Sequence, residues 1–539
     1  MNVPADPPPA TRTRPSRATL ARVALAAACL LIAAVYLAMA NLKGIGTDEG
    51  FRLGIINGGR EYTASEPGTS ATWGDVLRAN NPYAYQPLYF LVQNAVMRAA
   101  HTHDELVLKG VNVFFLWLGL LGLLALSRDW SLVPRLFALV VFGLNVFLFM
   151  HVLQLREYVV GITFYIWSSW LALRIDRRPL GRGWADVAWF SAYGGLLALG
   201  YFTQSWAVFP ACAQGLFLVL RRAGDRLRFY AHLALAYLIV LCLTWPYLLD
   251  HRQKVSIGHW GSDQTQLLPW LADGFHLVLT GHSFRQLPWI EHLLACWLAI
   301  LAAGLVLLLG RRRRVPAWAP LEEDQRQGLL MLLSLGVAVA FQIVYFIKVD
   351  TLSVWPRYFA LHYFFLIWLV ALGFKALWDQ ATAGSVSRLA RLGWRLAAGA
   401  ALAVMVVSGV WQVRSYHRNP YLDSGISAAV NWRLIGSGMA GLLRPNDIVL
   451  TQDFLHAWTL TFSRPLSNPV LPLKKLGPGP FLHVDRFVYL DTDGNFAALG
   501  EVTTQLAALG FGKVHPEELR SAGAGEGVPG WRALVFERR

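Results

Sequence analysis

The feature that most constrains this chain is a series of apolar blocks, each about 18 to 25 residues long, separated by short polar segments. A helix rises 1.5 Å per residue, so such a block crosses the roughly 30 Å hydrocarbon core of a bilayer. Only 15% of the 539 residues are charged, whereas soluble proteins carry roughly 25%. The pattern therefore predicts an α-helical polytopic membrane protein.

About eleven blocks are long enough to span a membrane. They cover residues 19–41, 106–126, 132–151, 157–174, 184–201, 204–220, 229–249, 290–310, 328–347, 358–378 and 396–413. The first is read as an uncleaved anchor, preceded by a disordered tail at residues 1–18 that is rich in Pro and Arg. The transmembrane domain is expected over 19–413, with a long loop at 42–105 that contains two amphipathic helices.

The composition changes after the last block, and residues 414–539 are predicted to form a small soluble α/β domain. Runs of β-branched and aromatic residues mark three strands, and one stretch has helical periodicity. The strands are expected at 447–450, 486–490 and 532–536, and the helix at 502–509.

The net charge of +15 comes from Arg clusters that lie between alternate blocks. These clusters include Arg12, Arg14 and Arg17; Arg174, Arg177, Arg178 and Arg182; Arg221, Arg222, Arg226 and Arg228; Arg311–Arg314; and Arg388, Arg391 and Arg395. Lys and Arg accumulate in cytoplasmic loops, so the clusters predict that the N terminus is inside and the C-terminal domain is outside, in the periplasm. A multi-pass inner-membrane location is expected. No basic, aromatic-interleaved stretch is left over to indicate a nucleic-acid partner.

Ionisable residues gather at the outer ends of the spans, and Asp48-Glu49 follows the first span directly. A carboxylate beside the membrane is suited to act as a general base or to bind a cation. The structural alternative is an amphipathic helix that Thr47 caps and whose acidic first turn complements the helix dipole.

Cations also stand on the outside, against the general charge bias. Arg156, in Arg156-Glu157-Tyr158, precedes the fourth span, while Lys348 and Arg357 flank the connector before the tenth. An Arg fork is suited to bidentate phosphate binding. The alternative is ordinary contact with lipid headgroups.

Two patterns that suggest metals are weak. The segment 250–292 is expected to be an external loop, and it contains His251, His259, His276, His282 and His292. These histidines show no HExxH spacing, so hydrogen-bonding histidines at the interface are preferred. Asp491-Thr492-Asp493-Gly494-Asn495 resembles the start of a calcium loop, but Phe496 and Val502 break the EF-hand pattern. A turn between strands is expected there.

Four short motifs in a fixed order resemble the GT-C superfamily of membrane glycosyltransferases, over roughly residues 19–380. They are Gly46-Thr47-Asp48-Glu49, Tyr85-Gln86-Pro87-Leu88-Tyr89, Leu155-Arg156-Glu157-Tyr158 and Pro356-Arg357-Tyr358. The likeness is to the protein mannosyltransferase-like bacterial branch, which includes the aminoarabinose lipid A transferase and the Rgt-type galacturonosyltransferases. Gln86-Pro87 stands where that branch commonly has Pro-Pro, and residues 60–80 resemble an insertion.

The resemblance implies an inverting glycosyltransferase that moves a sugar from a polyprenyl-phosphate donor to an acceptor hydroxyl at the outer membrane face. Asp48 would be the base, and Glu49 would orient an Arg or the acceptor. Arg156, Lys348 and Arg357 would stabilise the leaving phosphate. The substrate-positioning residues would be Arg52, Gln86, Tyr89, Glu157, Tyr158 and Tyr358. The acceptor is a glycan such as lipid A, another lipid or a protein; no cofactor is required, and a divalent metal is left open.

Two other classes of protein share part of this sequence pattern. A transporter or flippase of a lipid-linked or amphipathic substrate would also be polytopic, but it should place polar or broken segments near the membrane midplane. A non-catalytic membrane scaffold would use the C-terminal domain for binding and would tolerate loss of Asp48 and the outer cations.

Overall fold

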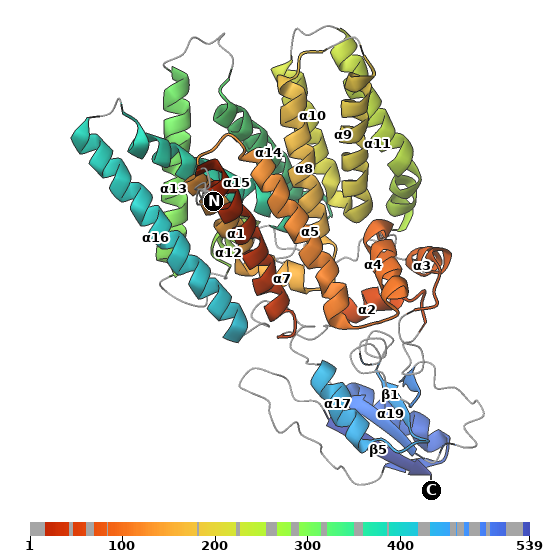
Figure 1. The fold of residues 1–539 in the computed structure, drawn as a ribbon. Helices are drawn as coiled ribbons and strands as arrows, with labels where there is room; N and C mark the ends of the chain where they lie inside the picture. The colour runs from red at the N-terminus through yellow and green to blue at the C-terminus, as the bar shows by residue number, and fades with distance from the viewer. Residues whose placement is uncertain are drawn as a thin grey trace, which may run out of the picture.

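The computed structural model describes residues 17–42, 47–60, 69–82, 85–180, 183–222, 227–254, 267–281, 290–313, 321–349, 359–384, 387–418, 432–452, 460, 468–473, 484, 486–491, 496–513 and 532–538. Most of them belong to a helical bundle, and the remainder form a small domain with a β-sheet (Figure 1). Residues 1–16 of the tail predicted at 1–18, residues 492–495 of the predicted Asp491 turn and residues 350–357 of the connector predicted at 348–357 lie outside these residues.

Each of the eleven predicted spans is helical. The helices are α1 (Arg17–Met39), α5 (Glu105–Leu126), the pair α6 (Leu132–Gly143) and α7 (Val146–Leu153), α8 (Tyr158–Arg177), α9 (Trp184–Thr203), α10 (Val208–Arg221) after the short η1 (Ser205–Ala207), α11 (Leu227–Lys254), α13 (Ile290–Arg313), α14 (Glu323–Val349), α15 (Ala360–Thr382) and α16 (Arg388–Arg418). In the described part of the chain, eight of them are long and apolar enough to cross a membrane, and the bent pair α6–α7 makes a ninth. α16 continues to Arg418, past the boundary predicted at 414.

Helix α15 is the centre of the bundle, because 94% of its most apolar stretch is buried. It packs against α6, α8, α13, α14 and α16. Aromatic rings fill these contacts: Phe374 stacks on Phe137 with 3.9 Å between ring centroids, and Trp368 stacks on Trp130 at 4.9 Å. Stacked rings bury large apolar areas, which holds the surrounding helices on this central one.

The predicted span at 132–151 is wrong as a single helix, because the chain bends by 58° between α6 and α7. A helix start leaves backbone N–H groups without helical partners. Here Asn145 accepts from the Phe147 N–H at 2.8 Å, and the Gln412 side-chain oxygen accepts from the Val146 N–H at 2.7 Å. Asn145 also donates to the Val278 carbonyl at 2.9 Å. The Gln412 side chain of α16 and the Val278 carbonyl of α12 thus satisfy polar groups at the break.

Three short helices follow α1: α2 (Thr47–Ile56), α3 (Trp73–Asn80) and α4 (Pro87–Ala100). α2 and α4 are the two helices expected in this loop, and α3 lies in the segment that resembles an insertion. α3 starts with a capping box, in which Thr72 and Asp75 satisfy each other's backbone N–H groups. Gly58 follows α2 by two residues; its φ of +66° suits glycine, and a Cβ at this position would lie 2.8 Å from the Cβ of Asp75 in α3.

Another short helix, α12 (Leu267–Thr280), lies in the region 250–292 that was expected to be an external loop. It packs against α7, α13 and α15. His276 of α12 is buried, and its Nδ1 lies 3.2 Å from the hydroxyl of Thr280. This part of the predicted loop is therefore built into the bundle.

The C-terminal domain contains a five-stranded sheet with strand order β2-β1-β3-β5-β4. Its elements are α17 (Trp432–Leu442), β1 (Ile448–Thr451), β2 (Val470–Pro472), β3 (Arg486–Asp491), α19 (Phe496–Ala508), β4 (Phe511–Lys513) and β5 (Arg532–Arg538). β2, β1 and β3 are parallel, whereas β5 is antiparallel to both β3 and β4. The predicted strands correspond to β1, β3 and β5. Alternate residues of the strands pack against α17 on one face and α19 on the other.

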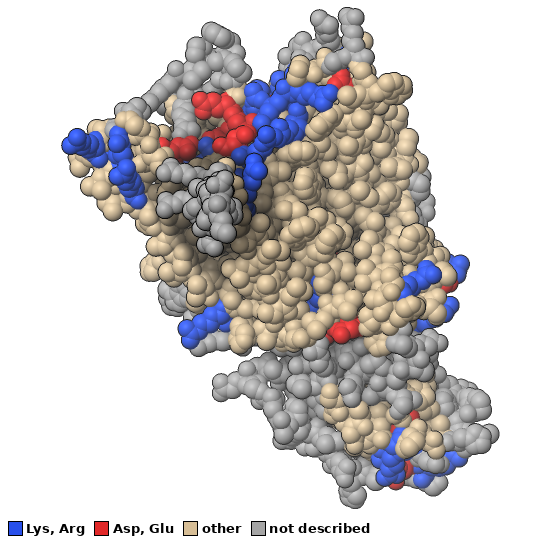
Figure 2. All heavy atoms as spheres, viewed as in Figure 1, with Lys and Arg blue, Asp and Glu red and all other residues tan. Residues whose placement is uncertain are grey.

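The two ends of the bundle differ in charge. Figure 2 shows Lys and Arg gathered at one end of the bundle, with a broad uncharged surface between that end and the other. We call it the basic end; it holds the C-terminal ends of α5 and α8. The opposite end, which we call the site end, carries α2, α3 and α4, and the C-terminal domain lies beyond it (Figure 1).

Candidate active site

The first motif begins helix α2 at the site end. Thr47 is its first residue and Asp48 its second; the side chain of Asp48 lies outside the described residues. Glu49 is buried, with 3% of its surface exposed, and its Oε1 accepts a hydrogen bond of 3.1 Å from the Leu155 N–H. Glu49 therefore joins the first motif to the connector between α7 and α8.

Arg52 lies one helical turn after Asp48 and makes a second link to that connector. Its guanidinium forms an ion pair with Glu157 and lies over the ring of Tyr85, 5.5 Å from the centroid. Arg52 is buried, and both desolvation and the nearby positive charge of Arg156 lower its pKa. Residues of the second and third motifs, which are far apart in sequence, thus meet around the guanidinium of Arg52, three residues after the first motif.

The connector that holds Arg156 is fixed by its backbone. Asn112 of α5 donates from one side-chain nitrogen toward the carbonyl oxygens of Val152 at 3.1 Å, Gln154 at 2.6 Å and Arg156 at 3.3 Å. Arg156 itself is buried, with 8% exposed. This clamp holds the Arg156 backbone in place while α8 begins at Tyr158.

Tyr158 and Tyr89 line the same region. The ring of Tyr158 lies 4.7 Å from that of His151. Tyr89 is almost fully buried, and its hydroxyl accepts from the Gln93 side chain at 3.0 Å. Burial raises the pKa of Tyr89, so its hydroxyl is protonated at neutral pH. Gln86 precedes α4 as its N-cap residue and is half-buried.

The remaining predicted residues are placed only in part. Lys348 is the penultimate residue of α14, and its side chain lies outside the described residues. Arg357 and Tyr358 lie outside them entirely. The structure therefore brings together the motifs around Glu49, Tyr89 and Arg156, and leaves the fourth motif untested.

Two buried polar residues at this site were missed by sequence reasoning. Lys109 of α5 is 1% exposed; it forms an ion pair with Glu105 and donates to the Ala40 carbonyl at 2.9 Å. It thereby ties α5 to the end of α1, directly before the segment that leads to Asp48. The signal was present, because Lys109 and Asn112 interrupt an otherwise apolar block, and ionisable residues inside spans usually have a function.

Among the residues that the structure describes, no group of three or more His, Cys, Asp or Glu side chains is placed to hold a metal ion. His259, His282 and the side chain of His251 lie outside those residues.

No family model and no curated protein sequence matches this chain. Its structure is similar to that of ArnT from Cupriavidus metallidurans bound to undecaprenyl phosphate, with a TM-score of 0.50 and 15% identity over 96% of this chain and 98% of that chain. Apo ArnT gives 0.52 and 14% identity over 97% and 98%. A mutant of the arabinofuranosyltransferase AftD from Mycobacteria gives 0.50 and 14% over 96% of this chain and 41% of the longer one. These matches show that the chain has the GT-C fold that its motifs predicted.

Proposed function

We propose that this chain is an inverting glycosyltransferase of the inner membrane. It moves a sugar from a polyprenyl-phosphate donor to an acceptor hydroxyl, at the site end, which faces the periplasm. The fold supports this proposal, as do two of the similar structures: ArnT, which is bound to undecaprenyl phosphate, and an arabinofuranosyltransferase. The sugar and the acceptor, whether glycan, lipid or protein, are not specified by the residues described.

One observation carries the proposal: Glu49, Arg52 and the connector that holds Arg156 are buried together at one end of the bundle. Burying charged groups is costly unless they are paired. A scaffold does not require buried charged groups at one end of the bundle, and a transporter site would be expected nearer the membrane midplane. A transferase needs it, because acid–base and anion-stabilising groups must be held in place before the substrate binds.

The proposed reaction is a single displacement. The acceptor oxygen attacks the anomeric carbon while Asp48 takes the hydroxyl proton. The bond from the anomeric carbon to the phosphate oxygen breaks, and its electron pair leaves with the polyprenyl phosphate. Attack opposite the leaving group inverts the anomeric centre. Glu49, held by the Leu155 N–H, orients the start of α2, on which Asp48 stands.

The leaving group is a phosphate, so positive charge matters more than a general acid. Arg156 is the described candidate for stabilising that charge, because its backbone is clamped by Asn112 and it lies close enough to Arg52 to lower the pKa of that residue. Lys348 and Arg357 are the further candidates. A phosphate held by Arg156 would also offset the repulsion between the two guanidinium groups. The proposed step uses no metal. Sugar transfer measured with added divalent cations and with a chelator tests this.

Transfer from a panel of radiolabelled polyprenyl-phosphate sugars tests the reaction class. Membranes from cells that express the chain are compared with vector-only membranes, and labelled products are separated from the donor. We expect chain-dependent transfer with at least one donor. If no donor is used, and a leaflet-exchange assay instead shows that the chain moves a lipid-linked sugar across the bilayer, the protein is a flippase and the proposal is wrong.

A further inference from the structure

We propose that the basic end of the bundle carries a second binding site, remote from the candidate active site, for the phosphate group of a membrane phospholipid. The inference does not depend on the proposed sugar transfer. It rests on a pocket, on an arginine that points into it, and on the aromatic surface around that arginine.

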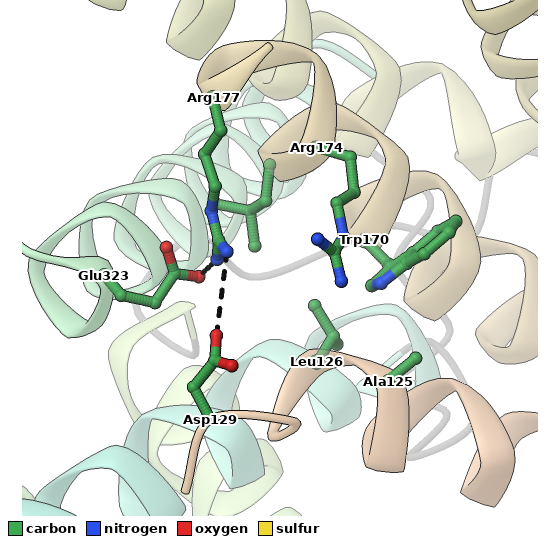
Figure 3. Close-up of a pocket in the computed structure, with 8 residues that line it drawn as sticks. Ala125, Leu126, Asp129, Trp170, Arg174, Arg177 and Glu323 are labelled. Carbon is green, nitrogen blue, oxygen red and sulfur yellow. Dashed lines mark ion pairs between the residues drawn. The ribbon is translucent and has the colours of Figure 1, made fainter.

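The pocket lies where the end of α5 meets α8 and the start of α14; its space of about 230 Å³ includes open solvent, so it is an open recess and not an enclosed cavity. It is lined mainly by Leu126, Asp129, Trp170, Arg174, Arg177 and Glu323. Figure 3 shows the Arg174 guanidinium pointing into the space between Trp170 and Leu126. Charged side chains therefore lie beside apolar ones around this pocket.

The arginines around this pocket differ in their partners. Arg177 pairs with Glu323 and lies 3.7 Å from Asp129, as the dashed lines in Figure 3 show. Arg178 pairs with Asp186 at 3.3 Å. Arg174 instead stacks over the ring of Trp170, 5.4 Å from its centroid, and no carboxylate among the residues that the structure describes forms an ion pair with it.

The carboxylates at this pocket are committed to other arginines. Two arginines and two carboxylates line it, and both carboxylates, Asp129 and Glu323, lie against Arg177. The nearby Asp176 is buried and shared between Arg221 at 3.5 Å and Arg326 at 3.7 Å. Arg174 is therefore the described lining arginine that is left to take a singly charged phosphodiester. An arginine fork is suited to bind it through two hydrogen bonds.

The surroundings of Arg174 favour a lipid as the source of the phosphate. Trp170 contacts Trp167 at 5.6 Å and Trp189 at 6.1 Å between ring centroids, and all three side chains are half-buried. Trp170 lies two turns before the end of α8, Trp189 lies in the second turn of α9, and Trp167 lies at the middle of α8. Tryptophan concentrates at the level of lipid headgroups, and the arginine stem lies along apolar surface while its charged end reaches the headgroup. The phosphate of a lipid in the adjacent leaflet lies at this depth.

Lipid binding by the purified, full-length protein tests the inference. Wild type, Arg174→Gln and the control Arg388→Gln are delipidated in detergent, and phosphatidylglycerol and phosphatidylethanolamine are titrated while bound lipid is counted by native mass spectrometry. Arg388 is the matched control because it is an exposed arginine at the start of α16 and away from the pocket.

Loss of a charge-assisted hydrogen bond should weaken the tightest lipid-binding step about tenfold in Arg174→Gln. Arg388→Gln should bind like wild type, and Arg174→Lys should bind at an intermediate level because it keeps the charge but loses the fork. Equal binding by wild type and Arg174→Gln would overturn the inference, as would an equal loss in Arg388→Gln. Displacement of the lipid by millimolar inorganic phosphate would show that the pocket takes a free phosphate instead.

The unfolding temperature separates binding from folding. Without lipid, Arg174→Gln should unfold at the same temperature as wild type, because Arg174 has no ion pair within the described structure. Added phospholipid should raise the unfolding temperature of wild type more than that of Arg174→Gln. An equal rise in the two proteins would contradict the proposed site.

Discussion

At the scale of single residues, Arg52 connects parts of the chain that are far apart in sequence. It lies on α2, pairs with Glu157 before α8 and contacts Tyr85 before α4. Sequence reasoning identified all three residues by type and position. It could not pair them, because a contact between residues about a hundred positions apart depends on how the helices pack.

Arg52→Ala should destabilise the protein, because it leaves the Glu157 carboxylate in a largely buried place without its ion partner. Removing one partner of a buried pair costs about 3–5 kcal/mol. Thermal unfolding in detergent measures this loss. The control is Arg78→Ala, which removes an exposed partner of Asp75 and should cost only about 0–1 kcal/mol. An equal loss of stability in the two variants would show that the Arg52 ion pair contributes no more to folding than an exposed one.

Arg156→Gln should lower kcat of sugar transfer by about 100-fold or more, in the range seen when one preorganised charge-stabilising donor is removed. Arg156→Lys should restore part of the rate, since it keeps the charge but loses the fork. Arg98→Gln, on the same end of the molecule in the last turn of α4, serves as control. A wild-type kcat in Arg156→Gln would show that other cations stabilise the leaving phosphate.

At the scale of elements, the length of the apolar blocks predicted where helices lie, and each of those blocks is helical. The break between α6 and α7 could not be predicted, because the groups that stabilise it come from α12 and α16, far along the chain. The same holds for α12 itself, which sequence reasoning assigned to a loop because its apolar stretch is too short to span.

Asn145→Ala should lower stability by about 1–2 kcal/mol, because it removes the side-chain cap of α7. The control is Ser131→Ala, since Ser131 is the N-cap residue of α6 but makes no side-chain capping bond. Comparison of the two unfolding temperatures checks the prediction. An equal, small change in both would mean that the cap contributes little to the bend.

Lys109 joins two elements, α5 and the end of α1. Lys109→Met should destabilise the protein by about 3–5 kcal/mol, because it removes the ion partner of Glu105, which is buried. Lys109→Met with Glu105→Leu should recover most of the loss, since apolar replacement of both partners of a buried pair is often neutral. Sugar transfer should stay low in the double variant, because the Lys109 contact with Ala40 is still missing. Full recovery of both stability and transfer would contradict a positioning role.

At the scale of the whole molecule, the order of four weak motifs predicted the fold, and similarity to ArnT over nearly both full chains confirms it at 15% identity. The motifs could do this because their order along the chain, and the outer face on which they were all expected, are typical of that fold. The candidate site was predicted less completely. Asn112 and Lys109 act through backbone carbonyls of other segments, and such contacts leave no motif in the sequence.

The central claim is that the site end transfers sugar with Asp48 as the base. The direct measurement is transfer from a polyprenyl-phosphate sugar by purified protein in liposomes, comparing wild type with Asp48→Asn and with Asp75→Asn, whose carboxylate caps α3 on the same side. Transfer should collapse in Asp48→Asn and persist in Asp75→Asn. Transfer by Asp48→Asn at the wild-type rate would place the base elsewhere and contradict the proposed mechanism.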